Sequence, residues 1–245
     1  METYIKKAAE LLQNSKYTVA FTGAGISAES GIPTFRSKGG VWTKHDTSLL
    51  DIDQFYKNPK KTWEMINEIF YLFINKAKPN NAHYALAELE KKGLLTAIIT
   101  QNIDNLHQHA GNTNVYEYHG TSKILICKKC NIKYNTKDVN LSNLPPICDK
   151  CKSVLKPNFI FFGEGIPQEP HNFAMEASKK ADVFLVIGTT GKVMPASLIP
   201  IRAQENGAKI IEVNIATSEY TNSISKIFLK GKASIILPKI LKYIK

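Results

Sequence analysis

The strongest constraint on the fold is an alternation of short apolar runs with helical patterns along most of the chain. The apolar runs fall at 16–21, 94–100, 114–118, 159–162, 182–188 and 208–214, and helical patterns such as 81–93 and 195–207 lie between them. Continuous apolar strands separated by helices are typical of a parallel sheet that is covered on both faces. The sequence therefore predicts an α/β fold with a doubly wound, Rossmann-like parallel sheet.

Two segments interrupt this alternation. Residues 37–80 are helical and rich in aromatic side chains, and residues 121–156 contain all four cysteines. We expect both insertions to pack together as a second, smaller domain made of a helical module and a metal-binding ribbon. The larger domain is then predicted to comprise 1–36, 81–120 and 157–245.

The cysteines form two Cys-x-x-Cys pairs, Cys127 with Cys130 and Cys148 with Cys151, separated by 17 residues. Each pair turns two thiolates toward one metal ion, and two pairs at this separation match a tetrahedral four-cysteine zinc site. A redox pair or a chance pattern would not explain two pairs with matched spacing. Because four protein ligands leave no open coordination position, the expected zinc ion is structural.

The chain carries a net charge of +11, from 32 Lys and Arg against 21 Asp and Glu. Such an excess fits an acidic partner or an anionic cofactor, but the lysines are scattered, which also fits a general compositional bias. The ribbon lysines lie beside Asp138 and Asp149 without a series of stacking aromatics, so we expect no direct nucleic-acid readout.

The first 15 residues have the pattern of an amphipathic helix instead of that of a secretory signal. No apolar run approaches the roughly 20 residues that a membrane span needs. We therefore expect a cytoplasmic protein with no membrane partner.

A glycine-rich turn follows the first predicted strand, with Gly23, Gly25 and Ala28 in the spacing of a dinucleotide-binding fingerprint. In such sites glycines let the backbone approach a pyrophosphate at a helix N-terminus. The acid that normally binds the ribose should end a second strand roughly 20 residues on. Asp46 is a poor candidate because no convincing strand precedes it, which argues against a hydride-transferring dehydrogenase.

The residues after the turn also differ from a simple strand–helix–strand unit. Pro33 resists continuation of a helix, so the glycine helix is expected to be short. Phe35 could shield a reactive carbon from water and Arg36 could meet a phosphate. The alternatives are a core position for the phenylalanine and a surface position for the arginine.

Polar side chains follow the ends of two later strands. Asn102 and Asp104 come after the strand at 94–100, where ligands of open parallel sheets bind, and they suit a carboxamide or a ribose. Capping of the following helix is the alternative for either residue. His119 follows the strand at 114–118 and could act as a general base, with a structural role as the alternative.

Together these motifs resemble one family. GAGISAESGIPTFR, TQNIDNLHQHAG, YHG, the two Cys-x-x-Cys pairs, FFGE and IGTTGKVMPA occur in the order seen in sirtuins, and the chain is similar to archaeal and bacterial members. The resemblance implies an NAD-dependent protein lysine deacylase that consumes NAD. Its products are the free lysine, nicotinamide and an O-acyl-ADP-ribose.

The resemblance also implies roles for individual residues, with His119 as the catalytic base. The implied cofactor-binding residues are Gly23, Ala24, Gly25, Ser27, Phe35, Arg36, Gln101, Asn102, Ile103, Asp104, Gly188, Thr189, Thr190, Asn214, Lys232 and Ala233. The implied residues for the acyl-lysine peptide, which adds as a strand, are Ile160, Phe162, Gly163, Glu164, Val193 and Met194.

Some positions depart from the family pattern. Thr190 replaces a common serine, and Met194 stands where tyrosine is common. Succinyl-preferring members carry a tyrosine and an arginine where this chain has Ile66 and Ile69, so we expect weak desuccinylation, because burying a carboxylate without a partner is costly. We also expect this apolar site to admit longer acyl chains.

Two other functions stay open at this point. Some relatives are NAD-dependent ADP-ribosyltransferases that use the same pocket, although His119 favours deacylation. A zinc-ribbon binding module without catalysis would leave the glycine turn unexplained. The basic charge adds nucleic-acid-associated proteins to the expected acylated substrates.

Overall fold

The computed structural model describes residues 1–35, 40–41 and 46–244. Within this part of the chain the main sheet has six parallel strands in the order β3-β2-β1-β7-β8-β9. Its strands are β1 (Thr18–Thr22), β2 (Ala97–Thr100), β3 (Val115–Glu117), β7 (Val183–Ile187), β8 (Lys209–Asn214) and β9 (Ser225–Lys230). This arrangement confirms the predicted doubly wound sheet, and β1 and β7 are buried along their whole length.

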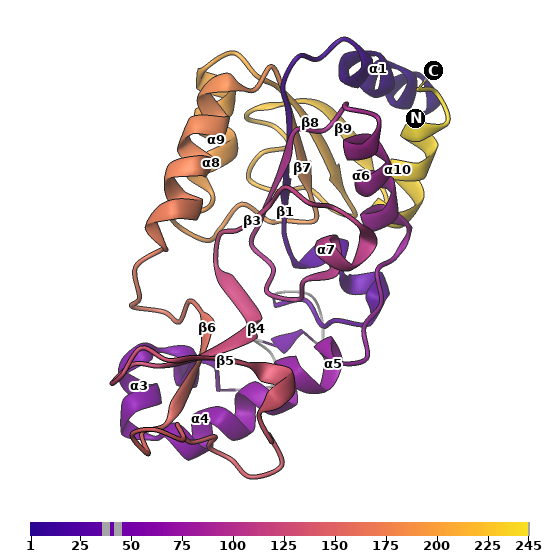
Figure 1. The fold of residues 1–245 in the computed structure, drawn as a ribbon. Helices are drawn as coiled ribbons and strands as arrows, with labels where there is room; N and C mark the ends of the chain where they lie inside the picture. Colours follow the sequence, from indigo (N-terminus) through magenta and orange to yellow (C-terminus); the bar gives the residue numbers. More distant parts are fainter. Residues whose placement is uncertain (36–39, 42–45, 245) are drawn as a thin grey trace.

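Helices cover both faces of this sheet (Figure 1). One face packs against α1 (Glu2–Gln13), α6 (Asn81–Lys91) and α10 (Ala233–Leu241). The other face packs against α8 (Gln168–Lys180) and α9 (Leu198–Glu205). Two separate layers of buried apolar residues result, which is why the central strands are apolar on both sides.

A second, three-stranded antiparallel sheet lies below the main sheet in Figure 1, in the order β5-β4-β6. Its strands are β4 (Gly120–Cys127), β5 (Lys133–Asn135) and β6 (Leu155–Phe159), and a single 3₁₀ turn, η5 (Thr136–Asp138), follows β5. The helical segments beside it are η3 (Thr47–Leu50), α3 (Ile52–Lys57), α4 (Pro59–Ile66), the π-helical η4 (Asn67–Tyr71) and α5 (Leu72–Ile74).

The helical segments and the antiparallel sheet share one apolar core, which we call the small-lobe core. It includes Trp63, Phe70, Leu155 and Phe161, all buried. The Trp63 indole N–H donates to the Leu155 carbonyl at 2.8 Å. Contact between the two insertions is therefore direct, and the domain boundaries given above stay a prediction.

One predicted strand is wrong. The run 159–162 was expected in the parallel sheet, but β6 ends at Phe159 and pairs antiparallel with β4. The reason is packing: the rings of Phe159 and Phe161 stack with centroids 5.4 Å apart, and Phe159 meets Phe70 edge-on at 5.4 Å. These apolar side chains serve the small-lobe core.

The sheet order reverses between β1 and β7, and the loops at their carboxyl ends meet there. A ligand of a doubly wound sheet binds at this switch point. The turn after β1 presses against the loop after β7, since Gly25 N–H donates to the Gly188 carbonyl at 2.8 Å. A Cβ atom on Gly25 would lie 2.7 Å from the Gly188 Cα, so only glycine fits without a shift of the backbone.

Substitution of Gly25 by alanine tests this contact. We expect Gly25→Ala to lower the free energy of unfolding by about 1–3 kcal/mol, as overpacking of a close contact does. Gly165→Ala is the matched control, because a Cβ there meets nothing within 4 Å, and it should change stability by less than about 0.5 kcal/mol. Equal urea denaturation curves for the two variants would contradict the prediction.

Candidate active site

The glycine turn consists of two short 3₁₀ turns, η1 (Ala24–Ile26) and η2 (Ala28–Ser30). It ends at Gly31, whose φ of 86° is in the left-handed region that favours glycine. The predicted shortening of the glycine helix is therefore present. Gly23 N–H donates to the Ile187 carbonyl at 3.0 Å, so both glycines fasten the turn to the end of β7.

Ser27 is the centre of a buried polar cluster that joins this turn to the loop after β2. Its hydroxyl donates to Asp104 Oδ2 at 2.6 Å and accepts from Asn102 Nδ2 at 3.1 Å. The N-cap of the short helix α7 (Leu106–Ala110) is Asn105, whose side chain makes no capping bond. Asp104, one residue earlier, accepts from the Leu106 N–H with its Oδ1 at 2.9 Å. Asp104 is therefore not the N-cap that the sequence left open; one carboxylate oxygen bonds to Ser27 and the other to the first helical N–H of α7.

His83, to which no sequence motif pointed, completes this cluster. Its Nδ1 accepts from the Asn80 N–H at 3.2 Å, so the neutral ring carries its proton on Nε2, which lies 3.4 Å from Ser27 Oγ. Burial lowers the pKa of His83 to about 4, which keeps it neutral at pH 7. The usable signal was the capping box at the start of α6, with Asn80 as N-cap and His83 three residues on.

A second buried histidine lies behind the cluster. The ring of His107 packs edge-on against that of His83 with centroids 5.0 Å apart, and its Nε2 lies 2.9 Å from Thr22 Oγ1. Burial lowers the pKa of His107 well below its ordinary value. Both rings are therefore neutral at pH 7.

His119 lies after β3, and one hydrogen bond fixes its tautomer. Its Nδ1 is 3.0 Å from the carbonyl oxygen of Gln101, and a carbonyl only accepts. Nδ1 therefore carries the proton of the neutral ring, and Nε2 keeps its lone pair. Burial lowers the pKa of His119 below its ordinary value of 6.5, which favours the neutral form. This is the protonation state of a general base.

Other predicted cofactor residues lie at the carboxyl ends of the same sheet and are hydrogen-bonded to one another. The Gln101 side-chain amide donates to Thr189 Oγ1 at 3.1 Å, and the Asn214 amide donates to the Thr189 carbonyl at 2.9 Å. Gly188, with a φ of 62°, begins this loop. Asp46 has a different role: it caps η3, accepting from the Ser48 N–H at 3.2 Å.

The remaining predicted cofactor residues are less tightly tied to the cluster. Ile103 and Phe35 pack against the small-lobe core, with the Phe35 ring 6.0 Å from that of Phe70. Lys232, just before α10, pairs with Glu29 at 3.1 Å. Three further positions, Ala24, Thr190 and Ala233, are half-buried, exposed and buried respectively. Arg36 lies outside the described residues.

The predicted peptide-binding residues come from two segments. Ile160 N–H donates to the His119 carbonyl at 2.8 Å, which brings the 160–164 segment next to the candidate base. Phe162 and Met194 are 47% and 63% exposed, unusual for large apolar side chains, while Val193 is half-buried. Gly163 has a φ of 84°, and the carboxylate of Glu164 turns back to the Phe161 N–H at 2.9 Å.

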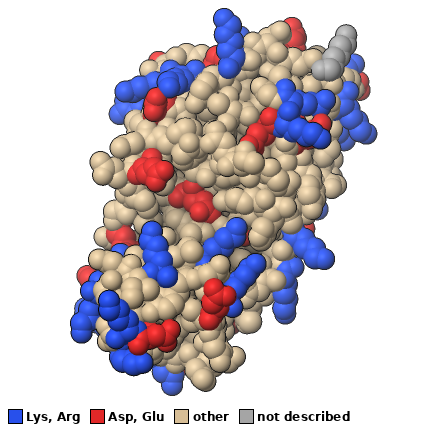
Figure 2. Space-filling model, viewed as in Figure 1, with Lys and Arg blue, Asp and Glu red and all other residues tan. Residues whose placement is uncertain are grey.

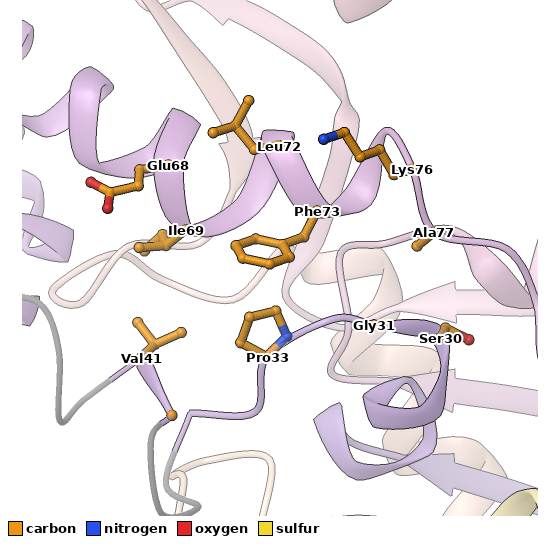
Figure 3. A pocket seen from close by; sticks show the side chains of 11 residues that line it. Ser30, Gly31, Pro33, Val41, Glu68, Ile69, Leu72, Phe73, Lys76 and Ala77 are labelled. Carbon is orange, nitrogen blue, oxygen red and sulfur yellow. The ribbon is translucent and has the colours of Figure 1, made fainter.

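A pocket of about 550 Å³ lies between the loop after the glycine turn and the helical segments η4 and α5 (Figure 3). Its walls are mostly apolar, with charged side chains at Glu68 and Lys76; the lining residues are Ser30, Gly31, Pro33, Gly40, Val41, Glu68, Ile69, Leu72, Phe73, Lys76 and Ala77. Ile69 is the one residue of the predicted acyl site among them, since Ile66 is buried in the core behind it.

The four cysteines converge as the spacing predicts. Their Sγ atoms all lie within 4.8 Å of one another, with Cys127 and Cys151 at 3.3 Å and Cys130 and Cys148 at 3.6 Å. Zinc–sulfur bonds of about 2.3 Å in a tetrahedron place the sulfurs roughly 3.8 Å apart. The set therefore fits a zinc ion with four thiolate ligands, which is a structural site.

Both cysteine pairs sit on equivalent turns. The fifth residue of each turn, Asn131 and Lys152, has a positive φ and donates its N–H to the first cysteine's carbonyl, at 2.7 and 2.9 Å. Tyr134 adds a contact that the spacing alone does not predict: its hydroxyl lies 3.2 Å from Cys148 Sγ and accepts from the Asp149 N–H at 3.2 Å. The hydroxyl proton is therefore free to point at the sulfur.

Comparison with known proteins identifies the family. The Sir2 family model matches residues 23–195. An NAD-dependent protein deacylase of Pyrococcus abyssi is 45% identical, covering 96% of each chain. NAD-dependent protein deacylase 2 of Archaeoglobus fulgidus is also 45% identical, covering 100% of this chain and 98% of its own.

Solved structures agree over the full length. A structure described in work on the mechanism and regulation of Sir2 enzymes has a TM-score of 0.91 at 44% identity, covering 100% of this chain and 98% of its own. A Sir2 variant with a deacetylated p53 peptide and 3′-O-acetyl ADP-ribose has a TM-score of 0.92 at 37% identity, covering 97% of each chain. A Sir2–p53 peptide–NAD⁺ complex has a TM-score of 0.90 at 37% identity and the same coverage.

The Tyr134 contact yields a test of the metal site. A hydrogen bond to a zinc-bound thiolate orients the ligand, and loss of such a partner typically weakens metal binding by about 10–100-fold. We expect Tyr134→Phe to release zinc to a coloured chelator about tenfold faster than the unsubstituted protein does. The exposed Tyr56, in the same lobe, offers the control Tyr56→Phe, and equal release rates for both variants would refute the role of Tyr134.

Proposed function

This chain belongs to the Sir2 family of NAD-dependent protein deacylases, and we propose that it transfers the acyl group of an acyl-lysine to ADP-ribose and releases nicotinamide. The acyl-transfer product is the feature that distinguishes this reaction from simple hydrolysis. In the structure of a Sir2 variant with a deacetylated p53 peptide, 3′-O-acetyl ADP-ribose is also present, and these are two of the three products of such a reaction.

The observation that carries the proposal is the environment of His119. Its Nδ1–H is committed to the Gln101 carbonyl, so the free Nε2 lone pair is available to accept a proton. Bound NAD would supply a ribose whose bond to nicotinamide can be broken. We propose that His119 Nε2 takes the proton of a ribose hydroxyl that attacks the acyl group.

The cluster around Ser27 supports a place for the carboxamide end of NAD. Asn102, Ser27 and Asp104 present amide, hydroxyl and carboxylate groups within one buried network, which suits a polar, uncharged group. Gln101, Thr189 and Asn214 supply further hydrogen-bonding groups along the strand ends. We propose that Gln101, Thr189 and Asn214 bind the ribose and adenosine part of NAD. Gly23 and Gly25 would shape the turn beside its phosphates.

The peptide is proposed to add as a strand between the 160–164 segment and Val193–Met194. Exposed Phe162 and Met194 support this, because they leave apolar surface available on either side. The proposed protein substrates are proteins with acylated lysines. The net charge of +11 adds nucleic-acid-associated proteins, although Lys and Arg on the face in Figure 2 are interspersed with Asp and Glu instead of forming one patch.

One assay distinguishes this function from its alternative. The protein is incubated with NAD and an acetylated peptide, and all products are weighed by mass spectrometry. Free lysine together with O-acetyl-ADP-ribose supports the proposal. A protein whose mass rises by one ADP-ribose would instead support an NAD-dependent ADP-ribosyltransferase, and no change in mass would reject both.

His119 gives the sharpest test of the mechanism. We expect His119→Ala to lower kcat by at least about 100-fold, the usual contribution of a general base, while NAD still binds. In the unsubstituted enzyme the acid limb of kcat/KM should have its midpoint below pH 6.5, because burial lowers the pKa of His119 and the base works only when neutral. A midpoint above 6.5, or full turnover by the variant, would assign the base to another group.

The acyl pocket is the finer part of the proposal. Ile66 and Ile69 are buried and contribute neither a hydroxyl nor a guanidinium where succinyl-preferring relatives have both. A carboxylate buried among such side chains loses several kcal/mol of hydration. The apolar pocket that Ile69 lines supports an extension of the substrate range to longer acyl chains, because pockets of about 300–1,000 Å³ hold small apolar ligands.

Rates on one peptide carrying acetyl, succinyl or myristoyl groups test this selectivity. We expect desuccinylation to be at least about tenfold slower than deacetylation, and demyristoylation to be measurable. The double variant Ile66→Tyr/Ile69→Arg should raise the succinyl-to-acetyl ratio, with Leu72→Arg at the exposed rim of the pocket as control. Fast desuccinylation by the unsubstituted enzyme would overturn this interpretation.

A further inference from the structure

Lys156 of β6 is a buried cation, only 2% exposed. Its Nζ lies 2.7 Å from Glu164 Oε2 and donates to the carbonyls of Phe159 at 2.7 Å and Pro157 at 3.0 Å. The same Nζ lies 4.0 Å from the centroid of the Phe161 ring. Because an ammonium group has three donors, all three are satisfied here, and the charge is fully paired inside the protein.

The carboxylate of Glu164 that pairs with Lys156 also closes a turn of the backbone. Its Oε2 also accepts from the Phe161 N–H at 2.9 Å, and its Oε1 lies 3.7 Å from Lys128 Nζ. Gly163, inside the turn, takes the left-handed conformation. The ion pair therefore fixes the backbone of residues 159–164, which we call the FFGE segment.

The FFGE segment joins the candidate base to the helical segments of the small lobe. Ile160 N–H donates to the carbonyl of His119 at 2.8 Å. Phe162 N–H donates to the Leu50 carbonyl at 2.9 Å, and its carbonyl accepts from Ile52 N–H at 3.0 Å. Loss of the Lys156–Glu164 pair would therefore alter the backbone position on the proposed peptide side of the site, and not at the glycine turn.

We propose that Lys156 is a positioning residue for the acyl-lysine peptide: paired with Glu164, its positive charge holds the FFGE segment in the conformation that receives the peptide strand. This inference rests on the proposed deacylation. Loss of the charge weakens peptide binding while NAD binding, which depends on the glycine turn and the loops after β2 and β7, is unaffected. Lys156 acts through the FFGE segment and does not touch the reacting atoms.

The charge of Lys156 is sensitive to moderate alkali. Burial lowers the pKa of Lys156 to about 8, against the opposing influence of Glu164, and Lys128 adds to the lowering. Two further titratable groups lie near the FFGE segment: Tyr56, whose pKa is raised by burial and by Glu164, and Asp51, whose Oδ2 would lie 3.7 Å from a Cβ on Gly163. Above about pH 8 the Lys156 ammonium becomes neutral, whereas the unfolded chain keeps it charged to about 10.4.

The sign of the stability effect separates positioning from unfolding. Between about pH 8 and 10.4 the unfolded state binds more protons at this lysine than the folded state does, so this group makes the fold more stable as pH rises. A weaker affinity for the peptide in that window is therefore not a consequence of unfolding by this group.

The test compares four variants for KM on an acetylated peptide without other groups that titrate between about pH 7 and 9.5. At pH 7 we expect Lys156→Met and Glu164→Gln each to raise KM for the peptide by about tenfold or more, with KM for NAD changed less than about twofold. Lys156→Arg keeps a charge and should restore the peptide KM. Lys180→Met, which breaks the exposed Lys180–Glu176 pair of α8, is the matched control and should have no effect.

The pH series adds a readout that a purely structural role would not move. The unsubstituted enzyme should show a rising peptide KM above about pH 8, and Lys156→Arg, whose guanidinium stays charged, should not. Equal peptide KM values at pH 7 for Lys156→Met and the unsubstituted enzyme would overturn the inference. So would a rise of the peptide KM of Lys156→Arg above about pH 8 that matches that of the unsubstituted enzyme.

Failure of a variant and failure of the activity have different meanings. Should Lys156→Met fail to fold, Glu164→Gln and the pH series of the unsubstituted enzyme still test the role of the charge. If the unsubstituted enzyme converts no acyl-lysine peptide at all, the proposed function fails and this inference fails with it. If the unsubstituted enzyme is active and Lys156→Met leaves the peptide KM unchanged, the inference is rejected and the proposed function stands.

Discussion

The contact between the turn after β1 and the end of β7 is the constraint on which the site depends. The N–H groups of Gly23 and Gly25 are bonded to the carbonyls of Ile187 and Gly188. A Cβ on Gly188 would lie 2.5 Å from Ile26 N, and one on Gly25 would overlap Gly188 itself. These glycines are therefore required by the packing of two strand ends, whether or not a dinucleotide is bound. That packing in turn sets the place of Ser27.

Hydrogen bonds that start at Ser27 connect the loops after β1, β2 and β3 and so build the rest of the candidate site. Ser27 meets the loop after β2 through Asn102 and Asp104, and Gln101 of the same loop fixes the His119 ring after β3. These side chains come from the ends of three strands, so the parallel sheet supplies their order. The FFGE segment then joins the small lobe to the carbonyl of His119, on the side where we propose that the peptide binds.

The sequence predicts best what long apolar patterns and fixed spacings control. The buried strands β1, β2, β7 and β8 and the four-cysteine site could be predicted because each depends on local pattern alone. The edge strand β9 was not found, since only alternate residues such as Ile227 and Leu229 are buried and lysines flank them. The run 159–162 was misassigned because an apolar run does not show which of two cores its side chains pack in.

The buried polar residues were hardest to predict for a different reason. His83 comes from a segment distant from Ser27 in sequence, and Lys156 is one of many lysines; a lone histidine or lysine is usually at the surface or in a structural role. Only the fold shows that His83 meets Ser27 and that Lys156 meets Glu164. For Asp104 the sequence left an N-cap role open, but Asn105 is the N-cap, and the two Asp104 carboxylate oxygens accept from Ser27 and from the Leu106 N–H.

Burial has opposite consequences for the two titrating groups that flank the proposed peptide site. It lowers the pKa of His119, so the proposed base stays neutral over more of the acidic range. It also lowers the pKa of Lys156, to about 8, so the charge that orders the FFGE segment is lost sooner in the alkaline range. If both proposed roles hold, the same desolvation extends activity at the acidic end of the pH range and limits it at the alkaline end. A buried site built from a neutral base and a charged positioning residue has a working range set between those two groups, with neutral pH inside it.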